Sequence, residues 1–161
     1  MPVSTIDNSG ISPSAAISTS KLGTGAVLQV VNATYGTAST SSSSYVDTGL
    51  TATITPTSAT SKILVIVDVA DVTKPNVSGA YGKFQLVRSS TSILVFGGQT
   101  GYNGATSQYN TIGASSANYL DSPATTSATT YKVQFAEING GTLEVGSSGA
   151  YSTITLMEIA G

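Results

Sequence analysis

The chain has 161 residues, a length typical of one domain. Charged residues supply only 9% of it and the formal net charge is −2, while Ser and Thr together supply about 30%. There is no His and no Cys, which excludes the usual zinc sites, a thiol nucleophile and a Ser-His-Asp triad. Six basic residues argue against a nucleic-acid partner. The longest apolar run, residues 63–67, is too short to span a bilayer, so no membrane partner is expected either.

Residues 1–25 are predicted to form an extended N-terminal arm, followed by one domain over residues 26–161. The arm is rich in Ser, Thr, Gly and Pro, and it follows neither helical nor strand periodicity. Five isolated aliphatic side chains interrupt it: Val3, Ile6, Ile11, Ile17 and Leu22. So polar a segment buries too little surface to become ordered alone. We expect the aliphatic side chains to insert into grooves of a neighbouring protein, and packing on the arm's own domain is the alternative.

Strand patterns begin at residue 26, where an apolar run extends to residue 33. Residues 45–55 come next, and there Leu50, Ala52 and Ile54 alternate with threonines, which predicts a strand with one buried face. Residues 62–70 form the strongest strand pattern. Their β-branched run predicts a strand that is covered on both faces.

Six further strand patterns follow, at residues 81–88, 92–96, 117–121, 131–136, 142–145 and 151–160. A short polar turn joins the first two into a predicted hairpin. Tyr131, Val133 and Phe135 share one face of their strand, and Asn139-Gly140 favours a type I′ turn that joins this strand to the next as a second hairpin. About nine strands without a helical pattern predict an all-β fold, an antiparallel β-sandwich that is jelly-roll-like. Because hydroxyl-rich surfaces protect edge strands poorly, an oligomer is favoured.

The segment at residues 97–117 is long for a loop of a compact domain, which suggests function or contact with a partner. Its tyrosine rings could stack on sugar faces while its amides bond hydroxyl groups. The candidate residues for a glycan or partner contact are Gln99, Tyr102, Asn103, Gln108 and Tyr109. The alternative is that these tyrosines cover one end of the sandwich or pack between subunits.

The acidic residues do not form a predicted metal site. Asp68 and Asp71 are three positions apart on a strand and point to opposite faces, so we expect them to be solvated or paired with lysine. Glu137 and Glu144 flank the Asn139-Gly140 turn and could face each other and hold a cation, although solvated charges are the favoured interpretation. No metal or other cofactor is predicted.

Glu158 lies in a strand pattern near the C-terminus. If it is buried, it requires a partner, and the candidates are Lys21, Lys62 and Arg88. No Gly-x-Ser-x-Gly elbow is present, and lysines are the only bases near the many serines. The chain is therefore predicted not to be an enzyme.

A family resemblance rests on four segments, residues 21–33 (KLGTGAVLQVVNA), 45–56 (YVDTGLTATITP), 58–65 (SATSKILV) and 152–160 (STITLMEIA). In this order and spacing they resemble small β-rich virion proteins of tailed bacteriophages. The resemblance covers about residues 21–67 and the last ten residues, whereas the middle of the chain matches no pattern. It implies a jelly-roll-like sandwich, often a trimer, and it brings no catalytic residues.

The resemblance implies a structural protein on the surface of the virion. An arm of about 25 residues is too short for a fibre shaft. The favoured function is therefore capsid decoration (cement) or head projection, with the arm tethered to major capsid or tail proteins. The alternative is a short tail fibre or tail-tip module that binds host surface polysaccharide through residues 97–117.

Overall fold

The computed structural model describes residues 22–74, 77–100, 110–111 and 113–161, which contain strands and no α-helix. No helix among these residues could therefore cross a membrane. The strands are β1 (Val27–Tyr35), β2 (Ala38–Thr40), β3 (Val46–Ile54), β4 (Lys62–Val69), β5 (Thr73–Lys74), β6 (Tyr81–Arg88), β7 (Thr91–Thr100), β8 (Asn110–Thr111), β9 (Ser115–Asp121), β10 (Thr129–Ile138), β11 (Leu143–Val145) and β12 (Ser152–Ile159).

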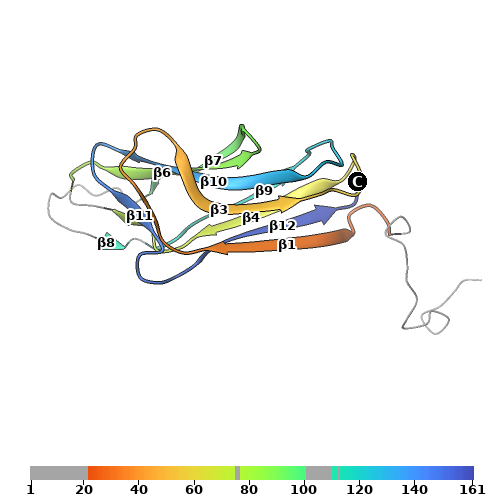
Figure 1. Cartoon of the computed structure of the whole chain (residues 1–161), viewed down its shortest axis with the longest axis horizontal. Coiled ribbons are helices and arrows are strands. Elements are labelled where there is room, and N and C mark those ends of the chain that lie inside the picture. The colour runs from red at the N-terminus through yellow and green to blue at the C-terminus, as the bar shows by residue number, and fades with distance from the viewer. Residues whose placement is uncertain (1–21, 75–76, 101–109, 112) are drawn as a thin grey trace, which may run out of the picture.

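Eight of these strands form two antiparallel sheets that pack as a sandwich (Figure 1). The strand order is β1-β12-β4-β9 in one sheet, called the β1 sheet below, and β3-β10-β6-β7 in the other, called the β3 sheet. The chain pairs as a set of nested hairpins: β1 with β12, β3 with β10, β4 with β9, and β6 with β7. Eight strands in two sheets with this nested pairing are a jelly roll, so the predicted fold class is confirmed.

The core lies between the two sheets and follows the alternation read from the sequence. On β3, Leu50, Ala52 and Ile54 are buried while the threonines between them are exposed, as predicted. The predicted shared face of β10 is likewise fully buried. The rings of Phe84 and Phe96 stack across the β6–β7 hairpin, with their centroids 5.8 Å apart. The predicted hairpin of β6 and β7 is thereby confirmed.

A third, small sheet, with strand order β2-β11-β5-β8, lies at the end of the sandwich opposite the C-terminus (Figure 1). Its strands have only two or three residues each. So short a strand has no readable period, which is why β2, β5 and β8 were not predicted.

The second predicted hairpin is wrong. Asn139 and Gly140 both have positive φ, 78° and 81°, as the type I′ pattern requires. However, β10 pairs with β3 and β6, whereas β11 pairs with β2 and β5 in the small sheet. The turn redirects the chain from one sheet to another, because both sides of β10 already have partners.

The predicted long loop is interrupted by strands. β7 continues to Thr100, residues 110–111 form β8, and β9 begins at Ser115. In the β6–β7 pair, residues 97–99 bulge out between two paired positions, and Gly97 adopts a φ of 60° there. Glycines with low strand propensity hid this extension in the sequence.

The described residues cover only one face of β4, whereas cover on both faces was predicted. Ile63, Val65, Val67 and Val69 are buried in the core, but no described residue covers the opposite face, where Ile66 is 40% exposed. The β-branched run therefore predicted the strand correctly, but it did not predict that the described residues leave one face of the strand uncovered.

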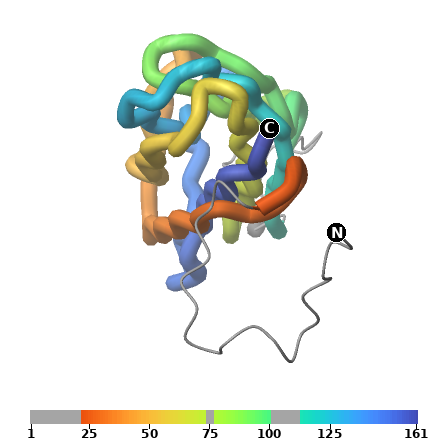
Figure 2. The backbone as a smooth tube through the Cα atoms, turned by 90° about the vertical axis from the view of Figure 1, so that its right-hand side faces the viewer, coloured from red at the N-terminus to blue at the C-terminus, as the bar shows by residue number. Residues whose placement is uncertain are grey.

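The start of β1 lies next to the end of β12 (Figures 1 and 2). The Gly25 N–H donates to the Ala160 carbonyl oxygen, and the Ala160 N–H donates to the Ala26 carbonyl oxygen, both at 2.8 Å. The segment that leads into the sandwich therefore enters along a sheet edge, beside the C-terminal residues.

Candidate functional site

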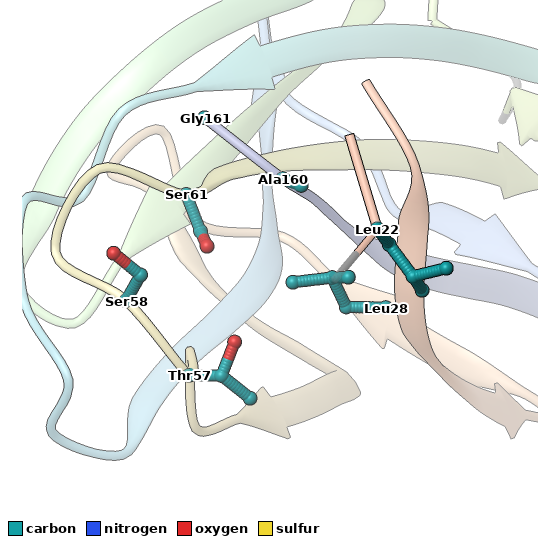
Figure 3. Close-up of a pocket in the computed structure, with 7 residues that line it drawn as sticks. All are labelled: Leu22, Leu28, Thr57, Ser58, Ser61, Ala160 and Gly161. Atoms are coloured by element: carbon teal, nitrogen blue, oxygen red, sulfur yellow. The ribbon is translucent and has the colours of Figure 1, made fainter. Parts of the chain in front are cut away.

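A pocket of about 320 Å³ opens where the chain enters the sandwich (Figure 3). Its apolar wall consists of Leu22 and Leu28, and its polar wall consists of hydroxyl side chains from the β3–β4 loop. The described residues that line it are Leu22, Leu28, Thr57, Ser58, Ser61, Ala160 and Gly161. None of these described residues has a charged side chain.

Glu158 lies behind the polar wall and is fully buried. Its Oε1 accepts hydrogen bonds from the backbone N–H and the hydroxyl of Thr57, both at 2.7 Å, and its Oε2 accepts one from Gln29 Nε2 at 2.5 Å. The Ser61 hydroxyl is buried as well. It forms no hydrogen bond of ordinary geometry, but it helps to stabilise the carboxylate. Neutral donors hold this charge, and neither Lys62 nor Arg88 is its partner, whereas Lys21, the third candidate, lies outside the described residues.

Burial alone raises the pKa of Glu158, but the hydrogen bonds from Gln29 and Thr57, together with the Ser61 hydroxyl, outweigh it and hold the pKa below its ordinary value. The register of β1 against β12 places Gln29 directly opposite Glu158, and β3 ends just before Thr57. The carboxylate thus joins the first strand, the last strand and the β3–β4 loop. Since it is shielded from solvent, its role is structural.

Of the five predicted arm residues, only Leu22 belongs to the part of the chain that the structure describes. It is 41% exposed and lines the pocket. Val3, Ile6, Ile11 and Ile17 lie outside the described residues, so their contacts stay predictions.

Of the five predicted loop residues, Gln99 alone is described, and it is exposed near the end of β7. Tyr102, Asn103, Gln108 and Tyr109 lie outside the described residues. Glycan binding at this segment, and with it the tail-tip alternative, stays a prediction.

The acidic residues near β4 and in the small sheet serve local structure. Asp71, with a φ of 47°, accepts hydrogen bonds from the Ser148 hydroxyl and from the N–H groups of Ser148 and Ala150 at 3.3 Å. The Ser148 hydroxyl is the main cause of a lowered Asp71 pKa. The Asp71 carboxylate stays partly exposed, as the expected solvation requires, and it also forms a contact between two loops.

Glu137 and Glu144 do not face each other across a hairpin, because β10 and β11 do not pair. Glu137 is buried, and its Oε2 accepts the Gly140 N–H at 3.1 Å, which helps to shape the turn. Among the described residues there is no group of three or more acidic, His or Cys side chains that could hold a metal ion.

An ion pair that the sequence analysis missed links the two sheets. Arg88 at the end of β6 donates from Nη1 to both carboxylate oxygens of Asp121 on β9, at 2.8 and 2.9 Å. The Tyr131 hydroxyl on β10 donates to the same carboxylate at 2.7 Å, and burial followed by this bond raises the pKa of Tyr131. A signal existed: Arg88 is in phase with the buried Phe84 and Leu86, so it points toward the core side of β6.

Comparisons with known proteins add no relative: no family model matches the chain, and no curated sequence is significantly similar to it.

Proposed function

We propose that the chain is a non-enzymatic structural protein of the tailed-bacteriophage particle. It acts at the particle surface as a capsid decoration (cement) or head-projection protein, tethered through its N-terminal arm. The observation that supports this proposal is the jelly roll itself. The resemblance implies a jelly roll, and the observed strand order is that of a jelly roll. Jelly rolls are common in viral capsid proteins. Because a fold can serve many functions, the proposal needs a direct test.

The position of Leu22 is compatible with a tether. It lies beside an open pocket at a sheet edge, so a segment attached there can leave the sandwich without crossing the core. Twenty-one residues precede it, and fully extended they span up to about 70 Å. That length is sufficient to reach across more than one neighbouring subunit.

The mechanism of this function is mechanical. Each arm lies in grooves between major capsid or tail proteins. The sandwiches associate with one another over the junction between these proteins, and the resemblance implies that they do so as trimers. Every bound copy buries surface across a subunit boundary and therefore opposes separation of the subunits.

The test removes residues 1–22 and measures attachment to particles that were assembled without the protein. We expect attachment to be abolished while the circular dichroism spectrum and cooperative unfolding of the sandwich persist. A matched variant keeps the arm's length but replaces its five aliphatic residues with serine, and it should also fail to attach. Attachment of either variant at the wild-type level would refute the tether.

Counting copies on purified particles distinguishes the two structural locations. A copy number comparable with that of the major capsid protein indicates capsid decoration, whereas a far lower number indicates the tail.

A further inference from the structure

The two outer faces of the sandwich differ in chemistry. On the β3 sheet, polar side chains bond one another across the strands: Gln134 Nε2 donates to Asp47 at 2.7 Å, Gln85 Nε2 to Gln134 at 2.6 Å, and the Ser92 hydroxyl to Gln85 at 2.8 Å. Lys132 Nζ lies 2.9 Å from the Asp47 carboxylate. This face has the polar surface usual for an antiparallel sheet that meets water.

The outer face of the β1 sheet is apolar at its centre. The register places one side chain from each of the four strands in a single row: Val30, Met157, Leu64 and Leu120. Val30 is 55% exposed and Leu120 50%. Val27, Ile159 and Ile66 extend the apolar surface to the adjacent rows. We call these seven residues the apolar face.

The apolar face explains why the sequence of β4 predicts cover on both sides. Leu64 and Ile66 alternate with the core residues of this strand, and nothing in the single chain's described residues covers Ile66. Contiguous apolar surface of this kind usually marks a contact with another molecule. Cover by a second molecule would account for this composition of β4.

The charges that flank the apolar face identify the partner. Lys62 and Asp68 are on this same face at the two ends of β4, about 20 Å apart at the rise of an antiparallel strand. The described residues offer neither of them an ion pair. If a second copy faces the first with β4 antiparallel to β4, each Lys62 meets an Asp68, and Leu64 meets Ile66. The face is therefore complementary to itself.

We propose that the apolar face of the β1 sheet is the surface through which copies of this chain bind one another, with Lys62 of one copy beside Asp68 of the next. The inference rests on the self-association within the proposed function and names a surface for it. Because the contact is self-complementary, it joins copies in pairs and is separate from the trimer that the resemblance implies. It predicts a contact between sheets about 10 Å apart, with an apolar centre and ion pairs at its rim.

The test is the molar mass of the purified full-length chain, measured by light scattering at increasing micromolar concentrations. We expect a dimer, because a contact that pairs β4 with β4 reciprocally closes with two copies. Ile66→Asp and Val30→Asp should lower its apparent association constant at least tenfold, and Ile66→Asn, which matches its row neighbours Asn32 and Asn118, should weaken it less. Val95→Asp is the matched control, because Val95 is 56% exposed on the outer face of the β3 sheet, and it should keep the wild-type mass.

If the wild-type chain is a monomer at all concentrations, the proposal is wrong. This holds whether the apolar face then meets solvent or is covered by residues 1–21 of the same chain. An oligomer that withstands Ile66→Asp and Val30→Asp but dissociates with Val95→Asp would overturn it as well. Circular dichroism of each variant confirms that a lower mass does not result from unfolding.

Charge exchange tests the orientation of the copies. Lys62→Asp and Asp68→Lys should each weaken association, and the double variant should restore it. If the double variant stays as weak as the single ones, the proposed pairing of the two residues is wrong. These measurements use no particles, so their failure is distinguishable from failure of the tether, which is measured by attachment.

Discussion

Replacing Glu158 by Gln tests whether neutral donors stabilise the buried charge. The substitution keeps the shape of the side chain but exchanges one acceptor oxygen for an NH₂ donor. If the amide oxygen keeps the two bonds from Thr57, the new NH₂ faces the Nε2 of Gln29. Gln29 cannot rotate its amide without loss, because its Nε2 also donates to the Thr55 carbonyl oxygen at 2.8 Å. At least one hydrogen bond is lost in either arrangement.

A hydrogen bond to a charged group contributes about 1.5–3 kcal/mol. We therefore expect Glu158→Gln to lower the free energy of unfolding at pH 7 by about 2 kcal/mol. For a domain of this size, that corresponds to a decrease in Tm of about 4–8 °C. Urea unfolding followed by circular dichroism measures the free energy, and a thermal scan measures Tm.

The destabilisation should depend on pH. The pKa of Glu158 is lower in the folded state than in the unfolded state, where it is about 4.3. The charge thus contributes its full stability above about pH 5, and this contribution is lost as the pH falls through the folded pKa. At low pH a protonated Glu158 presents an O–H donor much as Gln presents its NH₂. The difference between wild type and variant should therefore shrink below about pH 4.

Asp47→Asn provides the control. Asp47 also accepts hydrogen bonds from Lys132 and Gln134, but it is exposed, so its loss should cost less than about 1 kcal/mol. A Glu158→Gln variant as stable as wild type at pH 7, or a difference that stays constant from pH 7 to pH 3, would refute the argument from burial.

Two further predictions concern the ion pair between the two sheets and the bulge in β7. Asp121→Asn removes the negative charge and replaces one of the two acceptor oxygens that Arg88 and Tyr131 use by an NH₂ donor. It leaves a partly buried guanidinium without its counter-ion, so the free energy of unfolding should fall by about 3 kcal/mol; an unchanged urea midpoint would contradict this. Gly97→Ala should lower Tm by several degrees because of about 2 kcal/mol of strain. Gly97 has a φ of 60°, and an added methyl would clash with the hydroxyl oxygens of Thr100 and Ser115. Gly98→Ala is the adjacent control, with no atom within 4 Å of the added methyl, and equal effects of the two substitutions would count against the strain at the bulge.

The candidate site was only partly readable from the sequence. Arg88 carried a signal in its phase with the core residues of β6, but its partner Asp121 is 33 residues away and no local pattern connects them. Glu158 was recognised as a charge that needs a partner if buried. Its donors could not be named, because Gln29 and Thr57 reach it only through the register of β1 against β12 and the end of β3.

The sequence by itself determined the eight strands of the two large sheets and, on β3 and β10, the face that meets the core, because alternation of apolar and polar residues is a local property of the chain. The nested pairing of these strands as a jelly roll was implied by family resemblance, and only the tertiary structure decided it. The structure also decided that β11 leaves β10 for the small sheet, and that no described residue covers the second apolar side of β4. Contacts between residues far apart in the chain decide which strands pair, in which register, and what covers each face of a strand. The local alternation of apolar and polar residues therefore cannot specify them.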